Sequence, residues 1–176
     1  MEQTAILDNQ AISRVLERLA YEVIERHGDC HSLVLVGIQR RGADIAARLR
    51  KILALRLGHD VPQGALDINL YRDDWTTPSG KPAIAPSSMP VDCEGRDVLL
   101  VDDVLFTGRT IRAALEALLD YGRPRRVELL VLIDRGHREL PIHADYVGRK
   151  VNTSRSEQVD VLLLERDGRD EVRIGG

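Results

Sequence analysis

Two adjacent carboxylates and a glycine-containing turn occur together in VLLVDDVLFTGRT, residues 98–110. The unbroken apolar start predicts a strand buried on both faces, and Asp102 and Asp103 follow where we expect that strand to end. After a short turn, apolar residues at helical spacing from Ile111 onward predict a helix. Because the first N–H groups of a helix bind anions and Gly108 permits a close approach, this order predicts a phosphate site at residues 107–110.

A pair of arginines follows another buried strand. The segment LVLVGI, residues 33–38, leads into Gln39, Arg40 and Arg41 and then into a second helical pattern. Guanidinium groups match phosphate oxygens, so this pair is suited to a polyanion. Taken alone, the arginines would be interpreted as solvent-exposed loop residues, and only the carboxylates at another strand end favour the binding role.

Strands alternate with helices along most of the chain. Asp8 and Gly28 bracket a helix, and the last residues, GRDEVRIGG, predict an edge strand or a frayed tail. Further strands are expected at residues 65–71, 127–133, 143–147 and 159–164. This alternation predicts an α/β fold with a doubly wound, mostly parallel sheet flanked by helices. The carboxyl ends of its strands share one edge, where the charged residues would meet.

Composition limits the class of protein. With 176 residues, 43% hydrophobic and 30% charged, the chain fits a single domain spanning residues 1–176. A net charge of −3 gives no global nucleic-acid footprint, so a nucleic-acid surface would be a local patch. Cys30 and Cys93 do not suggest a disulfide framework, which favours a cytoplasmic location. No run approaches the roughly 20 apolar residues of a membrane span, so no membrane association is expected.

The segment of residues 71–90 differs in character from the rest. Pro78, Pro82, Pro86 and Pro90 interrupt it and no periodicity is visible, which predicts a long mobile loop. Such loops in compact domains often act as lids. Arg72 at its base would then add a positive charge when the loop closes.

These groups together suit a sugar that carries a monophosphate at one end and a pyrophosphate at the other. Asp102 and Asp103 would stabilise positive charge that develops on the sugar and bind Mg²⁺, while Arg40 and Arg41 neutralise departing pyrophosphate. A ring nitrogen of a base would attack the anomeric carbon. A phosphoacceptor receiver domain also has an acidic pair, but that pair lies near the start of the domain.

The segment VLLVDDVLFTGRT resembles the phosphoribosyl-pyrophosphate motif of type I phosphoribosyltransferases. More narrowly, LVGIQRRG, LDINLYRDD, DRGHRELPIHADYVG and NTSRSEQV make the chain similar to the pyrimidine operon attenuation regulator (PyrR) family. The resemblance runs almost end to end. It implies the type I phosphoribosyltransferase fold, with a flexible loop at about residues 71–90 and a small hood at about 134–160.

The resemblance also implies an activity. Members of that family transfer phosphoribose from phosphoribosyl pyrophosphate to uracil, giving UMP and pyrophosphate, and they regulate pyrimidine operons by binding leader mRNA in response to UMP or UTP. Asp102, Asp103 and Arg72 would serve in catalysis. The implied substrate-binding residues are Arg40, Arg41, Asp102, Asp103, Val104, Leu105, Phe106, Thr107, Gly108, Arg109, Thr110, Arg135 and Val159. A homodimer or a higher homo-oligomer is expected.

The family's RNA surface would include the first helix and part of the hood. The candidate phosphate contacts here are Arg14, Arg18, Arg26, Arg138, Arg149 and Lys150. The chain departs from the family pattern at Glu17, Tyr21 and His143, and a carboxylate at Glu17 would repel phosphate. Two alternatives therefore remain open: a phosphoribosyltransferase for another base, or a UMP-sensing RNA-binding regulator with little enzymatic activity.

Overall fold

The computed structural model describes residues 3–72, 87–89 and 92–176. A five-stranded sheet with the order β3-β2-β4-β5-β6 lies at its centre, and each neighbouring pair of strands runs parallel. These strands are β2 (Leu33–Ile38), β3 (Gln63–Leu66), β4 (Asp97–Leu105), β5 (Arg126–Asp134) and β6 (Tyr146–Lys150). The predicted parallel α/β sheet is confirmed.

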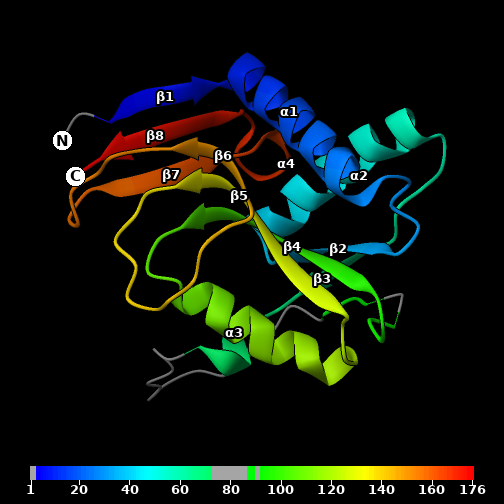
Figure 1. Cartoon of the computed structure of the whole chain (residues 1–176). Coiled ribbons are helices and arrows are strands. Elements are labelled where there is room, and N and C mark those ends of the chain that lie inside the picture. The colour runs from blue at the N-terminus through cyan, green and yellow to red at the C-terminus, as the bar shows by residue number, and fades with distance from the viewer. Residues whose placement is uncertain (1–2, 73–86, 90–91) are drawn as a thin grey trace.

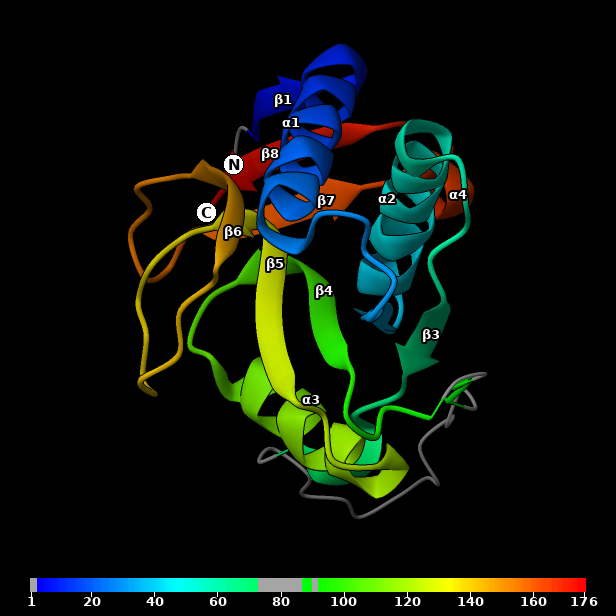
Figure 2. The same cartoon turned by 45° about the vertical axis from the view of Figure 1, so that its right-hand side comes forward.

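Helices cover both faces of this sheet (Figures 1 and 2). Helices α1 (Asn9–His27) and α2 (Arg41–Leu57) pack on one face, and α3 (Arg109–Leu118) packs on the other. Side chains of β4 alternate between the two cores, since Leu99 and Val101 join the α1 and α2 side while Val98 and Leu100 join the α3 side. Burial on both faces explains the unbroken apolar run.

Local signals in the sequence set the ends of α1. The backbone N–H of Ala11 donates to Asp8 Oδ1 at 2.7 Å, and Gly28 ends the helix with a positive φ of 61°. Ile12 and Leu19 lie fully buried on its inner face. Burying each such side chain contributes about 1.5–3 kcal/mol, so the helix is held mainly by its packing against the sheet.

A second sheet is formed by the two ends of the chain. Strands β1 (Thr4–Asp8), β8 (Glu171–Gly175) and β7 (Gln158–Leu162) are antiparallel in that order, with the short helix α4 (Leu164–Asp167) between β7 and β8. The prediction of an edge strand or tail at the C-terminus was wrong, because β8 is the central strand of this sheet. Strand β1 was not predicted. The hood was expected at residues 134–160, which contain β6 and the start of β7. The second sheet also contains β1 and β8, which lie outside that range.

Other element boundaries also differ from the predictions. The strand expected at residues 65–71 is shorter and begins earlier, since β3 spans Gln63–Leu66. A single 3-10 turn, η1 (Asn69–Tyr71), follows it in place of the remaining strand. The strand expected at residues 143–147 begins only at Tyr146. A second 3-10 turn, η2 (Leu119–Tyr121), extends α3. Of the predicted loop at residues 71–90, residues 73–86 and 90 lie outside the described residues. In the described part of the chain, no helix has the length and apolar character needed to cross a membrane.

A buried polar cluster closes the amino-terminal end of the sheet. Glu128, 3% exposed, accepts a hydrogen bond from the Tyr146 hydroxyl at 2.8 Å, and Nε2 of His27 lies 2.7 Å from the same carboxylate. Arg26 Nε lies 3.0 Å from Glu128 Oε1. Burial alone would raise the pKa of Glu128, but the hydrogen bonds from His27 and Tyr146 outweigh it and lower that pKa. The carboxylate is therefore more stable ionised in the folded protein than in the unfolded chain.

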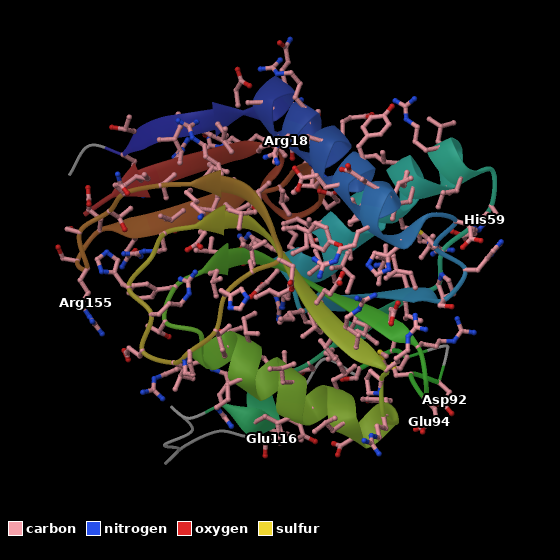
Figure 3. The ribbon with its side chains drawn as sticks, in the orientation of Figure 1. Arg18, His59, Asp92, Glu94, Glu116 and Arg155 are labelled. Carbon is pink, nitrogen blue, oxygen red and sulfur yellow. The ribbon has the colours of Figure 1, made fainter. Side chains whose placement is uncertain are left out.

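We expect Glu128→Gln to lower the free energy of unfolding at pH 7 by about 1–3 kcal/mol, because it leaves buried donors poorly paired. A lowered carboxyl pKa stabilises the fold above its unfolded value, near 4.5, and this contribution is lost as pH falls further. The difference between parent and variant should therefore narrow below that pH in urea unfolding experiments. Glu116→Gln on α3 (Figure 3) removes an exposed pair with Arg112 and should change stability by less than about 0.5 kcal/mol. Equal losses in both variants would contradict the role of the cluster.

Candidate active site

A cavity of about 200 Å³ opens at the carboxyl edge of the five-stranded sheet. The described residues that line it are Ile38, Gln39, Arg40, Arg41, Ile68, Asn69, Arg72, Asp102, Asp103, Val104 and Thr110. Strands β2 and β4 are paired neighbours, which brings the arginine pair and the carboxylate pair to one place. The convergence predicted from the strand ends is therefore present in the structure.

The two carboxylates belong to β4 itself. The sequence predicted that the strand ends before them, but β4 continues to Leu105 and Asp102 pairs with Val131 of β5. Asp102 is 5% exposed, and its Oδ1 accepts a hydrogen bond from the Asp103 backbone N–H at 2.9 Å. Burial and the neighbouring Asp103 charge raise the pKa of Asp102 well above its ordinary value. Asp103 is only half-buried, so it is the more accessible of the two.

Helix α2 begins directly beside these carboxylates. A Cβ at Gly42 would lie 2.4 Å from the Val101 carbonyl oxygen and 3.3 Å from Asp102 Oδ1, so only glycine permits this approach. The preceding Gln39–Arg40 peptide is cis. Arg40 stands at the N-cap of α2, and no described side chain caps that helix. The Ala43 N–H donates to the Arg40 carbonyl at 3.2 Å, so the N–H groups of Arg41 and Gly42 are the ones left for an anion in the cavity.

The turn before α3 has a similar arrangement. Gly108 occupies the N-cap with φ of 92°, a left-handed conformation that favours glycine, and Thr107 Oγ1 accepts a hydrogen bond from the Arg109 N–H at 3.3 Å. The carbonyl of Thr107 accepts the N–H of Glu139 at 2.9 Å, which fixes the turn. Thr110 is exposed in the first turn of α3 and lines the cavity. The predicted phosphate site at residues 107–110 thus coincides with a helix N-terminus.

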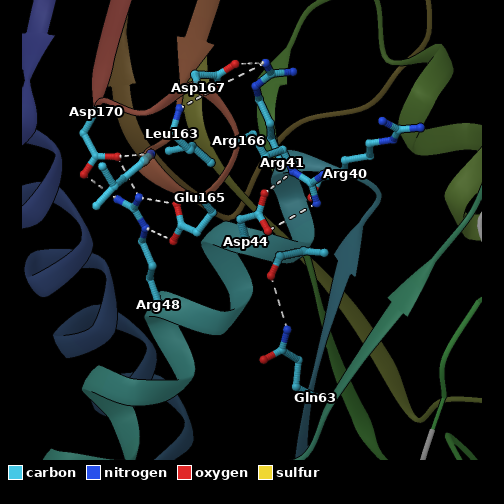
Figure 4. Close-up of polar contacts among 12 residues, drawn as sticks. Arg40, Arg41, Asp44, Arg48, Gln63, Leu163, Glu165, Arg166, Asp167 and Asp170 are labelled. Atoms are coloured by element: carbon cyan, nitrogen blue, oxygen red, sulfur yellow. Dashed lines mark hydrogen bonds and ion pairs between the residues drawn. The ribbon is translucent and has the colours of Figure 1, made fainter.

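The two arginines after β2 differ in their surroundings (Figure 4). Arg40 is exposed and forms no ion pair with any residue that the structure describes. Arg41 Nη2 donates to both carboxylate oxygens of Asp167, at 3.0 and 3.2 Å. The sequence suggested the same role for both side chains, whereas the structure holds only Arg41 against the C-terminal segment.

A second cavity, of about 400 Å³, lies over the carboxyl end of β5. It is lined by Asp134, Arg135, Gly136, His137, Arg138, Lys150, Val151, Asn152 and Thr153. Arg135 is 6% exposed, its Cζ lies 4.0 Å from the centre of the Phe106 ring, and its Nη2 donates to the Ser154 carbonyl at 3.0 Å. Burial lowers the pKa of Arg135. Leu105 pairs with Asp134 across β4 and β5, so the two cavities occupy adjacent strand ends.

Six predicted substrate-binding residues lie outside the described linings of both cavities, namely Leu105, Phe106, Thr107, Gly108, Arg109 and Val159. Two of them pack into the hydrophobic core instead. Val159, on β7, packs against the core on the α1 and α2 side and lies outside the described linings of both cavities. Leu105 is 1% exposed and belongs to the core on the α3 side. Neither side chain contacts either cavity, so any part they play in binding falls to the backbone.

The predicted RNA-contacting residues fall into two groups. Several are tied to other parts of the protein: Arg18 donates to the Gly148 carbonyl at 2.5 Å, Arg149 donates to the Ile6 carbonyl at 2.6 Å, and Arg138 lies 2.7 Å from Asp134. Arg26 belongs to the polar cluster around Glu128. Arg14 and Lys150 are exposed and have no ion pair among the described residues. Among the six candidates, Arg14 and Lys150 are therefore the two whose charge is not paired with another described residue.

The carboxylates also decide whether a magnesium ion fits. No cluster of three or more possible metal ligands exists among the residues that the structure describes. Mg²⁺ commonly binds through one or two carboxylates, with water and substrate phosphates completing its coordination. Asp102 and Asp103 line the cavity as such a pair. The donor set therefore suits an ion that arrives with a phosphorylated substrate.

Comparison with known proteins decides the family. The phosphoribosyl transferase domain model matches residues 2–166. The chain is 53% identical to the Bifunctional protein PyrR of Pelotomaculum thermopropionicum over 98% of this chain and 96% of the relative. The corresponding protein of Chloroflexus aurantiacus is also 53% identical, over 96% and 93%. This chain belongs to the PyrR family of phosphoribosyltransferases.

Solved structures agree with this assignment. A hypoxanthine phosphoribosyltransferase from Staphylococcus aureus superimposes with a TM-score of 0.64 at 25% identity, covering 86% of this chain and 79% of the other. The predicted family and the predicted type I phosphoribosyltransferase fold are both confirmed.

Sequence reasoning missed part of the lining of this phosphoribosyltransferase site. Asn69 was placed in a strand, although it lies in η1 and faces the first cavity. Asp167, which lines neither cavity but pairs with Arg41, was not predicted as a site residue either. A weak signal existed for each: Asn favours turns over strands, and the Asp167-Gly168 pair is typical of a helix end.

We expect Asp102→Asn to raise the thermal stability of this phosphoribosyltransferase at neutral pH when chelator is present. A carboxyl group whose pKa is raised on folding costs stability once pH exceeds its unfolded value of 3.8, and an amide avoids that cost. The stability gain should therefore grow as pH rises above about 4. Thermal unfolding across pH 4–8 measures it, with Asp29→Asn at an exposed position as the control. A variant that is less stable than the parent throughout this range would contradict the prediction.

Proposed function

We propose that this protein transfers phosphoribose from phosphoribosyl pyrophosphate to uracil, and that it also regulates pyrimidine operons by binding leader mRNA. The observation that carries the enzymatic part is the meeting of two helix N-termini and one carboxylate pair around a single cavity. Phosphoribosyl pyrophosphate has two anionic ends and a ribose between them. Its three parts correspond to these three groups.

The donor would be bound at both anionic ends. The 5′-phosphate lies at the α3 N-terminus, held by backbone N–H groups of the turn and the hydroxyls of Thr107 and Thr110. The pyrophosphate lies at the α2 N-terminus beside Arg40 and Arg41. Arg72, which also lines the cavity, adds charge on this side. Two helix dipoles directed at the two ends fix the orientation of the sugar between them.

The reaction breaks the bond between the anomeric carbon and the pyrophosphate oxygen and forms a bond to a uracil ring nitrogen. The bonding electrons leave with pyrophosphate, so positive charge develops on the ribose ring. Asp103, the accessible carboxylate, stabilises that charge and holds the ribose hydroxyls. Arg40 and the α2 N–H groups neutralise the departing pyrophosphate. A Mg²⁺ ion held by Asp102 and Asp103 would supply further neutralisation of phosphate charge when bound.

The base would occupy the second cavity. Arg135 is fixed there by the Phe106 ring and the Ser154 carbonyl, so its orientation is set before the base arrives. Backbone groups of the surrounding segment are available to hydrogen-bond the edge of a pyrimidine. The adjacent positions of the two cavities support a base bound next to the anomeric carbon.

The regulatory part rests on the surface shared by α1 and β6. These elements lie side by side (Figures 1 and 2), and a Cβ at Gly148 would lie 2.7 Å from Val15 Cγ1, so only glycine allows this close packing. Arg14 and Lys150 are exposed on these elements, and Lys150 also lines the base cavity. Bound UMP would therefore alter a residue on the RNA surface. Glu17 is already paired with Arg56 at 3.2 Å, which reduces its repulsion of phosphate.

We also place this protein in the cytoplasm as a homodimer or a higher homo-oligomer. Both of its cysteines are buried free thiols, which suits a reducing compartment. Leu55, on α2, is 80% exposed and offers an apolar contact for another copy.

We expect Asp103→Asn to lower kcat for uracil by about 10²-fold or more while leaving the fold intact, because charge developing in the transition state loses its partner. The assay follows UMP formation from uracil and phosphoribosyl pyrophosphate with and without magnesium. Hypoxanthine in the same assay tests the other base, since the superimposed Staphylococcus aureus structure is a hypoxanthine phosphoribosyltransferase. Turnover of hypoxanthine but not uracil, or a variant equal to the parent, would overturn the proposal.

We expect Arg14→Glu to weaken binding of a pyrimidine-operon leader RNA by about fivefold or more at 0.1 M salt, since one phosphate contact is lost. Uracil turnover should change little, because Arg14 lies on α1 and lines neither cavity. Arg123→Glu makes the same charge change in the loop between η2 and β5 and serves as the control. Filter binding with and without UMP measures the RNA affinity of both variants. If RNA binding is absent, or does not depend on UMP, the regulatory part is wrong and the enzymatic part stands alone.

A further inference from the structure

The first turns of α2 and the C-terminal segment form a ladder of alternating charges (Figure 4). Arg41, Asp44 and Arg48 occupy one face of α2 at the spacing i, i+3 and i+7. Their partners on α4 run in the opposite direction along the chain, namely Asp167, Arg166 and Glu165. Every rung pairs a positive with a negative group. A shift of the ladder by one rung would set like charges against each other, so its register is specified.

The Arg41–Asp167 and Asp44–Arg166 pairs hold the segment that is proposed to bind the pyrophosphate. Arg166 is ion-paired with Asp44, and its Nη2 also lies 3.5 Å from the Arg40 carbonyl. Asp167 contacts Arg41 through both carboxylate oxygens. Arg40 and Arg41 are therefore held from the side of α4, while Arg40 extends its side chain away from this cluster (Figure 4).

Asp167 is itself fixed independently of Arg41. Its Oδ2 accepts the Leu163 backbone N–H at 2.8 Å, and its own N–H donates to the Leu163 carbonyl at 2.7 Å. The Leu163 hydrogen bond, followed by the Arg41 pairing, lowers the pKa of Asp167. Arg41 Nε is buried and has no hydrogen-bond partner among the described residues, so Asp167 supplies the side-chain pairing that these residues give Arg41. A fixed carboxylate thus orients the Arg41 side chain.

We propose that Asp167 is a positioning residue for the pyrophosphate end of the donor site, acting through Arg41. This inference rests on the proposed function. Arg41 then serves chiefly as the anchor of the loop that carries Arg40 and the α2 N-terminus, and Arg40 contacts the anion. The C-terminal segment, which lines neither cavity among the described residues, takes part in donor binding in this way.

The direction in which anion affinity changes when Asp167 loses its charge distinguishes a positioning role from a purely electrostatic one. Removing a carboxylate beside an anion site strengthens anion binding by charge alone. We expect Asp167→Asn to do the opposite: the KM for phosphoribosyl pyrophosphate should rise roughly five- to thirtyfold, the scale of one or two kcal/mol, with the KM for uracil unchanged. Titration calorimetry with magnesium pyrophosphate should show the same loss of affinity. In an Arg41→Gln background, Asp167→Asn should add little.

Glu165→Gln is the matched control, because it makes the same change on α4 while Arg48 keeps Asp170 at 2.6 Å. It should leave the KM for phosphoribosyl pyrophosphate unchanged. Should Asp167→Asn fail to fold, Asp167→Glu keeps the charge but displaces it, and weaker pyrophosphate binding is again expected. Unchanged or tighter pyrophosphate binding in the folded variants would overturn the inference. If the parent protein binds pyrophosphate but does not convert uracil, the proposed function is refuted. The role of Asp167 is then tested by the calorimetric affinity for magnesium pyrophosphate alone.

Discussion

The close approach of α2 to β4 is the constraint on which the site depends. Gly42 lies against the Val101 carbonyl and Asp102, and any larger residue there would push the helix away. This contact sets a positive helix terminus beside two carboxylates, so an anion and the ribose attached to it meet their partners within one small cavity. Gly37 has the same relation to the first turn of α2, where a Cβ would lie 2.3 Å from the Ala43 Cα. Backbone packing, rather than side-chain reach, therefore creates the donor site.

That arrangement carries a cost in stability. Asp102 is almost fully buried beside Asp103, and its raised pKa shows that the folded protein disfavours its charge in the absence of a cation. The opposite end of the sheet shows the reverse balance, because Glu128 is buried among donors that lower its pKa. One end of the sheet therefore holds a buried carboxylate that is paired with Arg26 and His27, and the other holds a carboxylate whose charge is disfavoured until a substrate or an ion neutralises it.

The ends of the chain contribute more than closure of the fold. Strands β1, β8 and β7 bring both termini together, and α4 between β7 and β8 carries the acidic and basic groups that pair with α2. Two pairs among exposed side chains would contribute little alone. Several rungs that share fixed partners, such as Arg48 between Glu165 and Asp170, act together and set the position of a helix end. The small sheet thus has a physical link to the donor site.

The sequence by itself determined the parallel sheet, the ends of α1 and the gathering of Asp102, Asp103 and Arg40 at one edge, because these follow from local periodicity and from the geometry of parallel strands. It also determined the family, through motifs that span the chain. Only the tertiary structure decided that β4 continues through its carboxylates, that β8 is a central strand, and that Arg41 is held by Asp167 while Arg40 is not. Each of these depends on a partner far away in the sequence: β5 for β4, β1 for β8 and α4 for Arg41. A local pattern carries no information about such a partner, and the pairing energy that fixes it exists only once the chain has folded.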